Sequence, residues 1–331
     1  MMQRVMVFFL DMTFGGGGHT KAILRASPEV TVVALDRDPT AFSLAQQLPG
    51  APVAGRFSRL GALLSGLRLQ SGSVDAVLLD AGCSSMQMDC PKRGFSLSKD
   101  GPLDMRMDAD RYPDMPCAAD VVNALDQQAL ASILTAYGEE RHARKIASAM
   151  VEARSVYPIT QTHQLASVVA GSFAASALYA RKDRLQRPSH VATKTFQALR
   201  MFVNDELNEL HAGLCTAQIM LKPDGRLCVL TFHSLEDCLV KRFLHGEDVG
   251  APPCRSLRQR VQRWEEEEEE EKDGEKDSCH WVDLQRGVLM PQAEDVLENP
   301  RGRSAKLRAA FKQYPYGTWP QPAPIKSSLF F

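Results

Sequence analysis

The stretch that decides the fold class is Val5-Met-Val-Phe-Phe-Leu-Asp-Met-Thr-Phe-Gly-Gly-Gly-Gly-His19. Its first six residues form a continuous apolar run, which is typical of a parallel strand buried on both faces. The glycines that follow, Gly15 to Gly18, let the backbone turn tightly and approach a ligand, and a helix is predicted directly after them, over Thr20–Arg25. A strand, a glycine-rich turn and a helix in this order predict the first unit of an open α/β sheet.

Two further apolar runs continue this pattern. Val30–Leu35 and Val74–Leu79 each end in an aspartate, Asp36 and Asp80, and Pro39–Leu48 between them is predicted to be helical. Strands that alternate with helices favour a parallel sheet with right-handed crossovers. Ligands bind at the carboxyl ends of the strands in such sheets, so both aspartates are predicted to lie at the binding site.

The periodicity changes to helical in the middle of the chain. Helices are predicted over Ala119–Leu134, Glu139–Val156 and Leu165–Ala177, and strands return at Gly225–Phe232, after the turn Lys222–Gly225, and at Leu307–Phe311. An α/β domain with a helical insert of roughly 70–90 residues is the simplest organisation. The predicted parts are a first α/β segment 1–107, a helical insert 108–188, a second α/β segment 189–313 and an extended tail 314–331.

Composition and charge narrow the function classes. The chain has 331 residues, of which 44% are hydrophobic and 24% charged, which excludes wholesale disorder. No apolar stretch reaches the ~20 residues of a membrane span, so no membrane partner is expected. The segment 265–277 carries ten acidic residues against two lysines, a net of −8, so the remainder carries +7 of the total −1. A basic body permits a polyanionic partner, and the acidic loop 255–280 is predicted to be disordered.

The eight cysteines show neither zinc-ligand nor redox-pair spacing. We therefore predict no metal site and reduced thiols in a reducing compartment.

The glycine run and Asp36 together indicate a cofactor that contains adenosine. Asp36 follows Gly15 by 21 residues, and a carboxylate there can accept hydrogen bonds from both ribose hydroxyls. Dinucleotides and S-adenosylmethionine both use this layout. The dinucleotide fingerprint G-x-G-x-x-G fails, because its third glycine would fall on Thr20 or Lys21. An NAD-dependent oxidoreductase is therefore disfavoured, while a simple tight turn between strand and helix stays an alternative.

Two more constellations follow predicted strands. Asp80 and Ser84, in Asp80–Gln87, can orient an amino nucleophile, but Asp and Ser are equally suited to turns and helix caps. His233 follows the strand that ends at Phe232, where a chemical role competes with a structural one. In the structural alternative, Ser234 and Asp237 form a capping box for the next helix.

Taken together and in this order, the motifs resemble the RsmH/MraW family of S-adenosylmethionine-dependent rRNA N4-cytosine methyltransferases. The wording of Asp108–Asp126 is most similar to the vertebrate mitochondrial branch. The resemblance runs from about residue 8 to residue 313. The matching segments are Asp11–His19, Asp36–Pro39, Asp80–Gln87, Arg93–Met107, Tyr137–Glu140, Ala192–Arg200, Asn204–Leu207, Phe232–Asp237 and Asn299–Arg308.

This resemblance implies a Rossmann-like class I methyltransferase sheet with an inserted helical domain that recognises RNA. It implies S-adenosylmethionine as the cofactor and N4 of a small-subunit rRNA cytidine near the decoding centre as the target. Seven residues match the family's cofactor motifs: Gly17, Gly18 and His19 for the methionine end, Asp36 for the ribose, Phe57 for the adenine, and Asp80 and Gln87 for the rest of the pocket.

The catalytic candidates are Asp80, Ser84 and His233. The lone pair of cytosine N4 is delocalised into the ring, so Asp80 or a backbone carbonyl of its loop must accept a hydrogen bond from the amino group. The target base must be unpaired or flipped out. Phe95 is the candidate stacking partner for this base. Cations suit phosphate contacts, although the basic run 301–308 can equally be a solvated turn. The predicted RNA-binding residues are Arg93, Phe95, Arg106, Arg301, Arg303, Lys306 and Arg308.

The start of the chain departs from the family, which has several tens of residues before the Asp11 motif. The chain therefore reads as a truncated or alternatively started form without a visible presequence. We expect the mitochondrial matrix as its compartment from the resemblance alone, with the cytoplasm as the alternative. The rival function is a non-catalytic RNA-binding factor in ribosome assembly, whose partner would still be small-subunit rRNA or the assembling subunit. The oligomeric state is left open.

Overall fold

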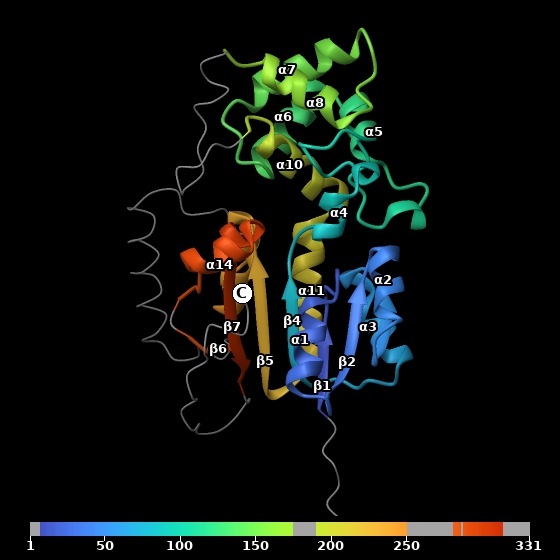
Figure 1. Cartoon of the computed structure of the whole chain (residues 1–331). Coiled ribbons are helices and arrows are strands. Elements are labelled where there is room, and N and C mark those ends of the chain that lie inside the picture. The colour runs from blue at the N-terminus through green and yellow to red at the C-terminus, as the bar shows by residue number, and fades with distance from the viewer. Residues whose placement is uncertain (1–6, 175–189, 250–280, 286, 314–331) are drawn as a thin grey trace, which may run out of the picture.

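A seven-stranded sheet forms the centre of the molecule (Figure 1). The computed structural model describes residues 7–174, 190–249, 281–285 and 287–313. In spatial order the strands run β3-β2-β1-β4-β5-β7-β6. Their bounds are β1 Phe8–Asp11, β2 Thr31–Asp36, β3 Ala51–Ala54, β4 Val74–Asp80, β5 Leu221–Thr231, β6 Trp281–Asp283 and β7 Lys306–Lys312.

The first five strands are parallel, and β7 runs antiparallel to both of its neighbours. The strand β1 pairs with β2 on one side and with β4 on the other, so the order of the chain reverses between β1 and β4. Ligands bind at such switch points, outside the carboxyl ends of the strands. The turns after β1 and β4 are therefore the two segments best placed to form a site.

Helices cover both faces of the sheet. Buried residues of β2 alternate between the faces: Ala34 packs with α2, and Leu35 packs in the cluster that α3, α11 and α12 share. The helix α1 packs through Ile23 against Leu78 of β4, on the opposite face from α11. These helices are α1 Gly18–Ala26, α2 Pro39–Ala45, α3 Leu60–Gly66, α11 Glu206–Met220 and α12 Ser234–Leu244.

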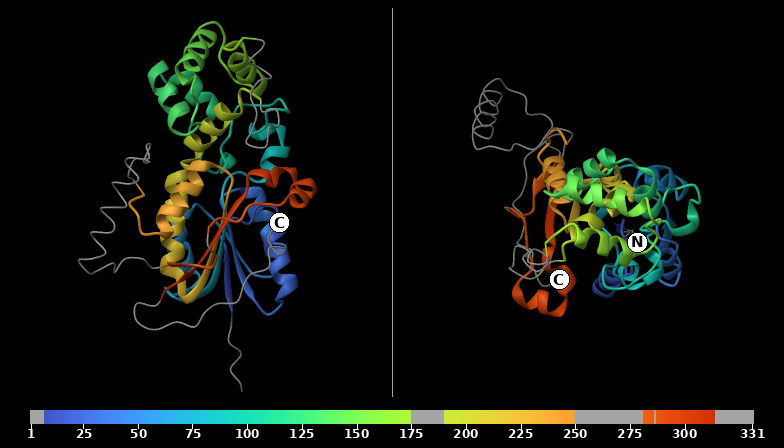
Figure 2. Two further views of the ribbon diagram at one scale, coloured as in Figure 1. Left: turned by 90° about the vertical axis from the view of Figure 1, so that its left-hand side faces the viewer. Right: turned by 90° about the horizontal axis from the view of Figure 1, so that it is seen from above.

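A second group of helices stands above the carboxyl ends of the parallel strands (Figures 1 and 2). We call it the helical unit; it comprises α5 Ala118–Ala124, α6 Gln127–Ala136, α7 Ala143–Arg154, α8 Thr162–Gly171 and α10 Thr193–Asn204. It has its own hydrophobic core, to which Phe95 and Met105 from the loop after β4 contribute, as do Phe196 and Leu199 of α10. The apolar packing thus draws on residues on both sides of the predicted insert 108–188.

Short elements complete the described chain. They are α4 Ser85–Asp89, α14 Ala293–Glu298 and the 3-10 turns η1 Phe57–Arg59, η2 Pro91–Arg93, η3 Ala109–Arg111 and η4 Pro300–Ser304.

The predicted fold class, a Rossmann-like α/β sheet with a helical insertion, is confirmed, and the differences are local. The single helix predicted over 119–134 is two helices, because Asp126 ends the first segment and caps α6 by accepting a hydrogen bond from the Ala129 amide. The edge strand β3 was not predicted, since it is short and contains Pro52, which only an edge strand tolerates. The predicted turn 222–225 lies inside β5 as an irregularity, and regular pairing resumes at Arg226.

The predicted acidic loop 255–280 and the predicted extended tail 314–331 both lie outside the described residues. No helix in the described ranges is long and apolar enough to cross a membrane.

Candidate active site

The glycine-rich turn after β1 presents open space to a ligand. Gly17 has φ +76°, and a Cβ there would lie 2.6 Å from the ring of Phe14, so only glycine fits. A Cβ at Gly16 or Gly18 would meet nothing within 4 Å. Gly17 caps α1 without any side-chain hydrogen bond, so no side chain of the cap satisfies the first N–H groups of this helix. Polar ligand atoms can bind there.

A buried aspartate fastens this turn to the loop after β4. Asp11 is fully buried, and it accepts hydrogen bonds from the Thr20 hydroxyl at 2.5 Å and from the Thr13 amide at 3.0 Å. The Thr13 hydroxyl in turn accepts a hydrogen bond from the Asp80 amide at 2.7 Å. Burial raises the pKa of Asp11. Sequence reasoning missed both threonine contacts, although the quoted motif Asp11–His19 contains two of the three residues.

Asp36 closes the other side of the glycine turn. One oxygen of its carboxylate accepts a hydrogen bond from the Gly15 amide at 2.7 Å, and the other accepts one from the Asp38 amide at 2.8 Å. Burial raises the pKa of Asp36 to about 6, so the group is ionised at neutral pH. A carboxylate held at the end of β2 beside the turn is suited to accept hydrogen bonds from ribose hydroxyls.

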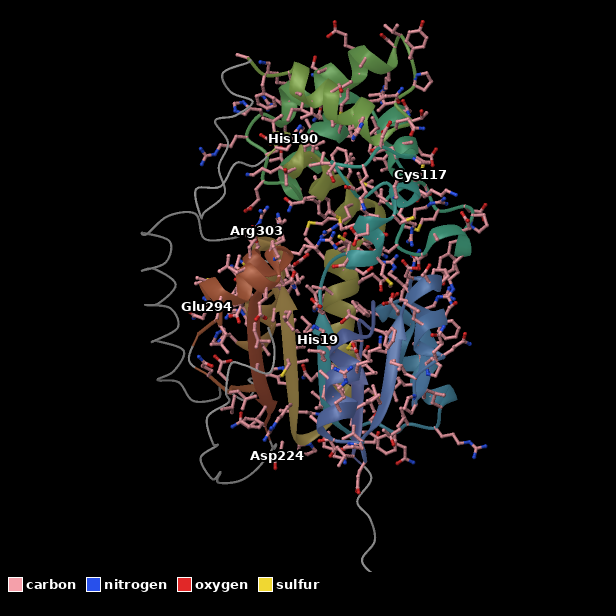
Figure 3. The ribbon with its side chains drawn as sticks, in the orientation of Figure 1. His19, Cys117, His190, Asp224, Glu294 and Arg303 are labelled. Carbon is pink, nitrogen blue, oxygen red and sulfur yellow. The ribbon has the colours of Figure 1, made fainter. Side chains whose placement is uncertain are left out.

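His19, in the first turn of α1, contacts Asp80, the last residue of β4. The Nε2 atom of His19 lies 3.3 Å from Oδ2 of Asp80, and both side chains are about one-third exposed, at 33% and 29%. The hydrogen bond with Asp80 raises the pKa of His19, against the opposing effect of burial. Figure 3 shows His19 at the upper end of α1, in front of the sheet. We call Gly15–Gly18, Asp36 and Asp80, with their immediate neighbours, the strand-end site.

The loop after β4 is organised by a capping box. The Ser84 hydroxyl accepts a hydrogen bond from the Gln87 amide at 3.3 Å, and the Gln87 side chain accepts one from the Ser84 amide at 2.9 Å. Ser84 also lies beside the glycine turn, since a Cβ at Gly15 would be 3.7 Å from its Cβ. Gln87 is only 3% exposed, and its Nε2 donates to Asp38 at 2.8 Å. Gln87 is thus held beside Asp38 within the protein, and its part in the cofactor pocket stays a prediction.

His233 has a structural role. It caps α12, with Nδ1 accepting a hydrogen bond from the Leu235 amide at 3.3 Å, and Glu236 completes the capping box. The capping box thus consists of His233 and Glu236, each one position before the predicted pair Ser234 and Asp237. Burial lowers the pKa of His233 to about 4, which makes the imidazole a poor proton acceptor at neutral pH. The prediction of a catalytic His233 is corrected in favour of the capping alternative.

A buried ion cluster contacts the loops after β4 and β5, and sequence reasoning missed it. Arg200 forms two hydrogen bonds of 2.8 Å with Glu206 and lies 3.5 Å from Glu236. Its guanidinium also donates to the thiol of Cys83 at 3.3 Å, in the loop after β4. Glu236 accepts hydrogen bonds from the Phe232 and His233 amides. These residues lie in quoted family motifs, which were the only signal available for them.

Phe57 is the first residue of η1, shortly after the end of β3. A Cβ at Gly213 of α11 would lie 3.1 Å from the Phe57 ring, so the ring packs closely against this helix and stays partly exposed. Glu209 of α11 accepts hydrogen bonds from both the amide and the hydroxyl of Ser58. This position is compatible with a ring that flanks a planar base beside Asp36.

Three predicted RNA contacts are turned into the protein. Arg93 donates to Asp38 at 2.6 Å and to two backbone carbonyls at 2.9 Å. Phe95 is 5% exposed in the core of the helical unit. Arg106 forms a two-nitrogen ion pair with Asp104. The prediction that these residues contact RNA, with Phe95 stacking on the target base, is corrected because packing and ion pairing occupy them.

The basic segment 301–308 is divided. Lys306 and Arg308 both donate to Asp237, at 2.7 and 2.8 Å, and are mostly buried. Arg301 pairs with Asp89 but keeps half of its side chain exposed. Arg303 is exposed on η4, and in the view of Figure 3 it lies below His190, which precedes α10. Arg301 and Arg303 keep exposed side chains, so phosphate contacts by these two stay a prediction, and the prediction for Lys306 and Arg308 is corrected.

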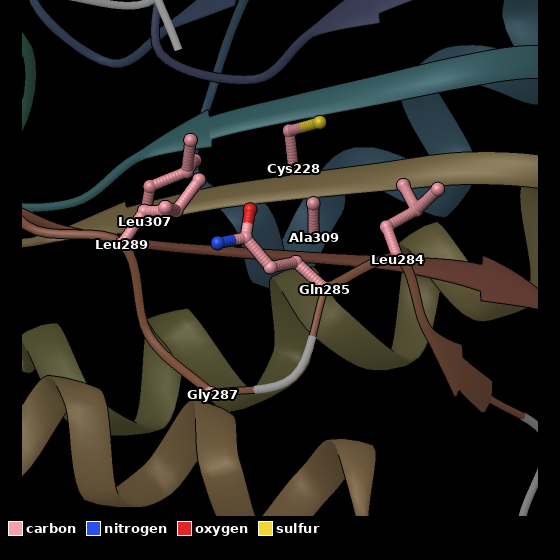
Figure 4. A pocket seen from close by; sticks show the side chains of 7 residues that line it. All are labelled: Cys228, Leu284, Gln285, Gly287, Leu289, Leu307 and Ala309. Carbon is pink, nitrogen blue, oxygen red and sulfur yellow. The ribbon is translucent and has the colours of Figure 1, made fainter. Parts of the chain in front are cut away.

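A small apolar pocket lies elsewhere, over β5 and β7 (Figure 4). It contains none of the predicted site residues; its lining is Cys228, Leu284, Gln285, Gly287, Leu289, Leu307 and Ala309. Within the described residues, no group of three His, Cys, Asp or Glu side chains is placed to hold a metal ion.

Comparison with known proteins gives a consistent result. The model of the MraW methylase family matches residues 1–313. The chain is 61% identical over 315 residues to a protein of Bos taurus named 12S rRNA N(4)-cytidine methyltransferase METTL15, covering 92% of this chain and 77% of that protein. The Homo sapiens protein of the same name is 60% identical with the same coverage. Ribosomal RNA small subunit methyltransferase H of Methylorubrum extorquens is 43% identical over 306 residues, covering 91% and 79%.

Proposed function

Because this chain belongs to the MraW methylase family, we propose that it transfers a methyl group from S-adenosylmethionine to N4 of a cytidine in small-subunit ribosomal RNA. The observation that carries the proposal is the strand-end site itself. The glycine turn, the Asp36 carboxylate and the His19–Asp80 pair meet at the switch point of the sheet. No other region of the described chain combines these features.

The residues of the strand-end site fit the cofactor. The space above Gly16 and Gly18 and the start of α1 can take the methionine end, together with Gly17 and His19. Asp36 would accept hydrogen bonds from the ribose hydroxyls, and the partly exposed ring of Phe57 would flank the adenine. S-adenosylmethionine, when bound, supplies a methyl group that is already activated by the sulfonium. The protein therefore has mainly to orient the acceptor and exclude water.

Asp80 is the group best placed to orient the acceptor. Its carboxylate is partly exposed at the end of β4, next to His19. By accepting a hydrogen bond from the N4 amino group, it would turn the N4 lone pair away from the ring and toward the methyl group. The Ser84 hydroxyl lies beside the same turn and can assist as a second polar contact. The cytosine must leave its stack to reach these residues.

The RNA side of the proposal rests on fewer residues. Arg301 and Arg303 lie on η4 and would contact phosphates; Figure 3 shows Arg303 just above the carboxyl end of β5. We also propose action on the assembling small subunit in mitochondria, because the mammalian relatives are named for 12S rRNA and Asp108–Asp126 resembles the vertebrate mitochondrial branch.

Nucleoside mass spectrometry tests the proposal. The chain would be incubated with methyl-labelled S-adenosylmethionine and small ribosomal subunits that lack the modification. We expect labelled N4-methylcytidine from the unchanged chain and, at sub-saturating cofactor, far less from Asp36→Ala. Label on another nucleoside, or no label while a relative is active in parallel, would contradict the proposed function.

A further inference from the structure

One buried carboxylate joins two arginines across the boundary between the sheet and the helical unit. Asp108 is fully buried, just before η3. Arg37 donates to it from Nε at 3.0 Å and also from Nη2, and Arg56 donates from Nε at 3.3 Å and from Nη2 at 3.0 Å. Desolvation offsets most of the attraction in a buried ion cluster, so net stabilisation is a weak reason for such an arrangement. A more specific consequence of the cluster is that it fixes the positions of Arg37 and Arg56 and of the residues next to them.

Each arginine is the sequence neighbour of a residue assigned to the cofactor. Arg37 follows Asp36, and Arg56 precedes Phe57. Neighbouring Cα atoms are about 3.8 Å apart, so fixing an arginine restricts where the adjoining residue can lie. Both arginines make their further contacts on the side of the helical unit: Arg37 donates to the Asn204 carbonyl at 3.0 Å, and the Arg56 guanidinium lies 4.6 Å from the centre of the Tyr112 ring.

Asp108 is itself held in one place. The Asn204 side chain, 1% exposed at the end of α10, accepts a hydrogen bond from the Met107 amide at 2.8 Å and donates to the Met105 carbonyl at 2.7 Å. Met105 and Ala109, on either side of Asp108, have φ of +61° and +50°. Residues with a Cβ adopt this conformation at a cost in free energy, and it persists where the surrounding structure fixes it. The segment therefore presents the carboxylate at a defined position.

We propose that Asp108 is a positioning residue for cofactor binding. Through Arg37 and Arg56 it sets the places of Asp36 at the end of β2 and of Phe57 at the start of η1. The inference rests on the proposed function, which assigns these two residues to the ribose and the adenine. Asp108 does not touch the cofactor, yet cofactor affinity depends on it. The helical unit thereby takes part in cofactor binding as well as standing above the site.

The test compares Asp108→Asn with Asp110→Asn. Asp110 lies two residues along and is fully exposed, so its variant is the matched control. The dissociation constant for S-adenosylmethionine would be measured by calorimetry, and KM and kcat with small ribosomal subunits. We expect Asp108→Asn to raise the dissociation constant and the KM for the cofactor about tenfold, with kcat at saturating cofactor and RNA affinity within about twofold. A residue needed only for folding would lower the active fraction, and hence kcat, without changing KM.

Arg37→Lys is the second variant, because it keeps the positive charge and removes the two-nitrogen contact with Asp108. We expect it to raise the cofactor dissociation constant about three- to tenfold, and it decides the matter if Asp108→Asn does not fold. Folded Asp108→Asn or Arg37→Lys protein with unchanged cofactor affinity would overturn the inference while leaving the proposed function intact. Failure of the unchanged chain to bind S-adenosylmethionine would instead overturn the proposed function, and the inference with it.

Discussion

Two regions of the molecule differ in whether their predicted ligand-binding residues face a possible ligand or the protein interior. These regions are the strand-end site and the pair of segments 93–106 and 301–308. At the strand-end site, Gly17, Asp36 and Asp80 lie together at one edge of the sheet. In the two segments, most of the predicted RNA contacts are buried or paired within the protein, and Phe95 is a core residue. A strand end is placed by topology, which the sequence pattern reveals. Whether a cation or an aromatic ring faces solvent depends on tertiary packing, which the local sequence does not reveal.

The largest effect is expected at Phe95, where the contrast is sharpest. Phe95→Ala should lower the free energy of unfolding by about 3–5 kcal/mol, because it removes a large buried side chain from the core of the helical unit. Chemical denaturation measures this loss. The exposed ring of Phe202 on α10 gives the matched control, and Phe202→Ala should cost much less. If Phe95→Ala left stability unchanged and weakened RNA binding instead, the inward assignment would be wrong.

The second prediction concerns Asp36 in the strand-end site. Asp36→Ala should weaken S-adenosylmethionine binding about 100-fold, since two hydrogen bonds to a charged group are lost. Calorimetry measures the change. Asp75 is the matched control: it lies in β4, away from the strand-end site, and accepts a hydrogen bond from the Phe8 amide at 2.8 Å. Equal losses in Asp36→Ala and Asp75→Ala would mean that the effect is one of folding rather than of cofactor contact.

The same contrast explains which parts of the site could be predicted from the sequence. Apolar runs that end in Asp36 and Asp80 were sufficient to place both residues, because parallel strands align their carboxyl ends. The contacts among Arg200, Glu206 and Glu236 could not be predicted, since tertiary folding brings these residues together from α10 and from the first turns of α11 and α12. His233 was misjudged for a related reason: the residue that caps α12 and the residue that faces a ligand occupy the same kind of position.

The titration of Asp36 gives a smaller and pH-dependent effect. Its pKa is raised to about 6, so the carboxylate is ionised above that pH and protonated below it. Cofactor affinity should therefore fall as the pH drops through 6, by at most about tenfold per pH unit. His19 is a second titratable group at this site, and the hydrogen bond with Asp80 raises its pKa. Asp36→Asn isolates the contribution of Asp36, and a pH dependence identical to that of the unchanged chain would assign the effect to another group.

The smallest effect is expected for the exposed cations. Arg301→Ala and Arg303→Ala should each weaken RNA binding by a few-fold, and each should reduce the slope of log affinity against log salt by about 1 if the arginine contacts one phosphate. Filter binding over a range of salt measures both quantities. Lys306→Ala is the control, because Lys306 pairs with Asp237 and should leave the salt slope unchanged. A loss of slope in the control alone would reverse the division of the basic segment.

The most direct test of the strand-end site is a crystal structure of the chain with S-adenosylhomocysteine, the product of methyl transfer. We predict that the ribose hydroxyls lie within hydrogen-bonding distance of the Asp36 carboxylate. The amino-acid end should lie over Gly17 and Gly18, and the sulfur should face the Asp80 loop. Product bound elsewhere, such as in the apolar pocket over β5 and β7, or bound without contact to Asp36, would contradict the assignment of this edge as the active site.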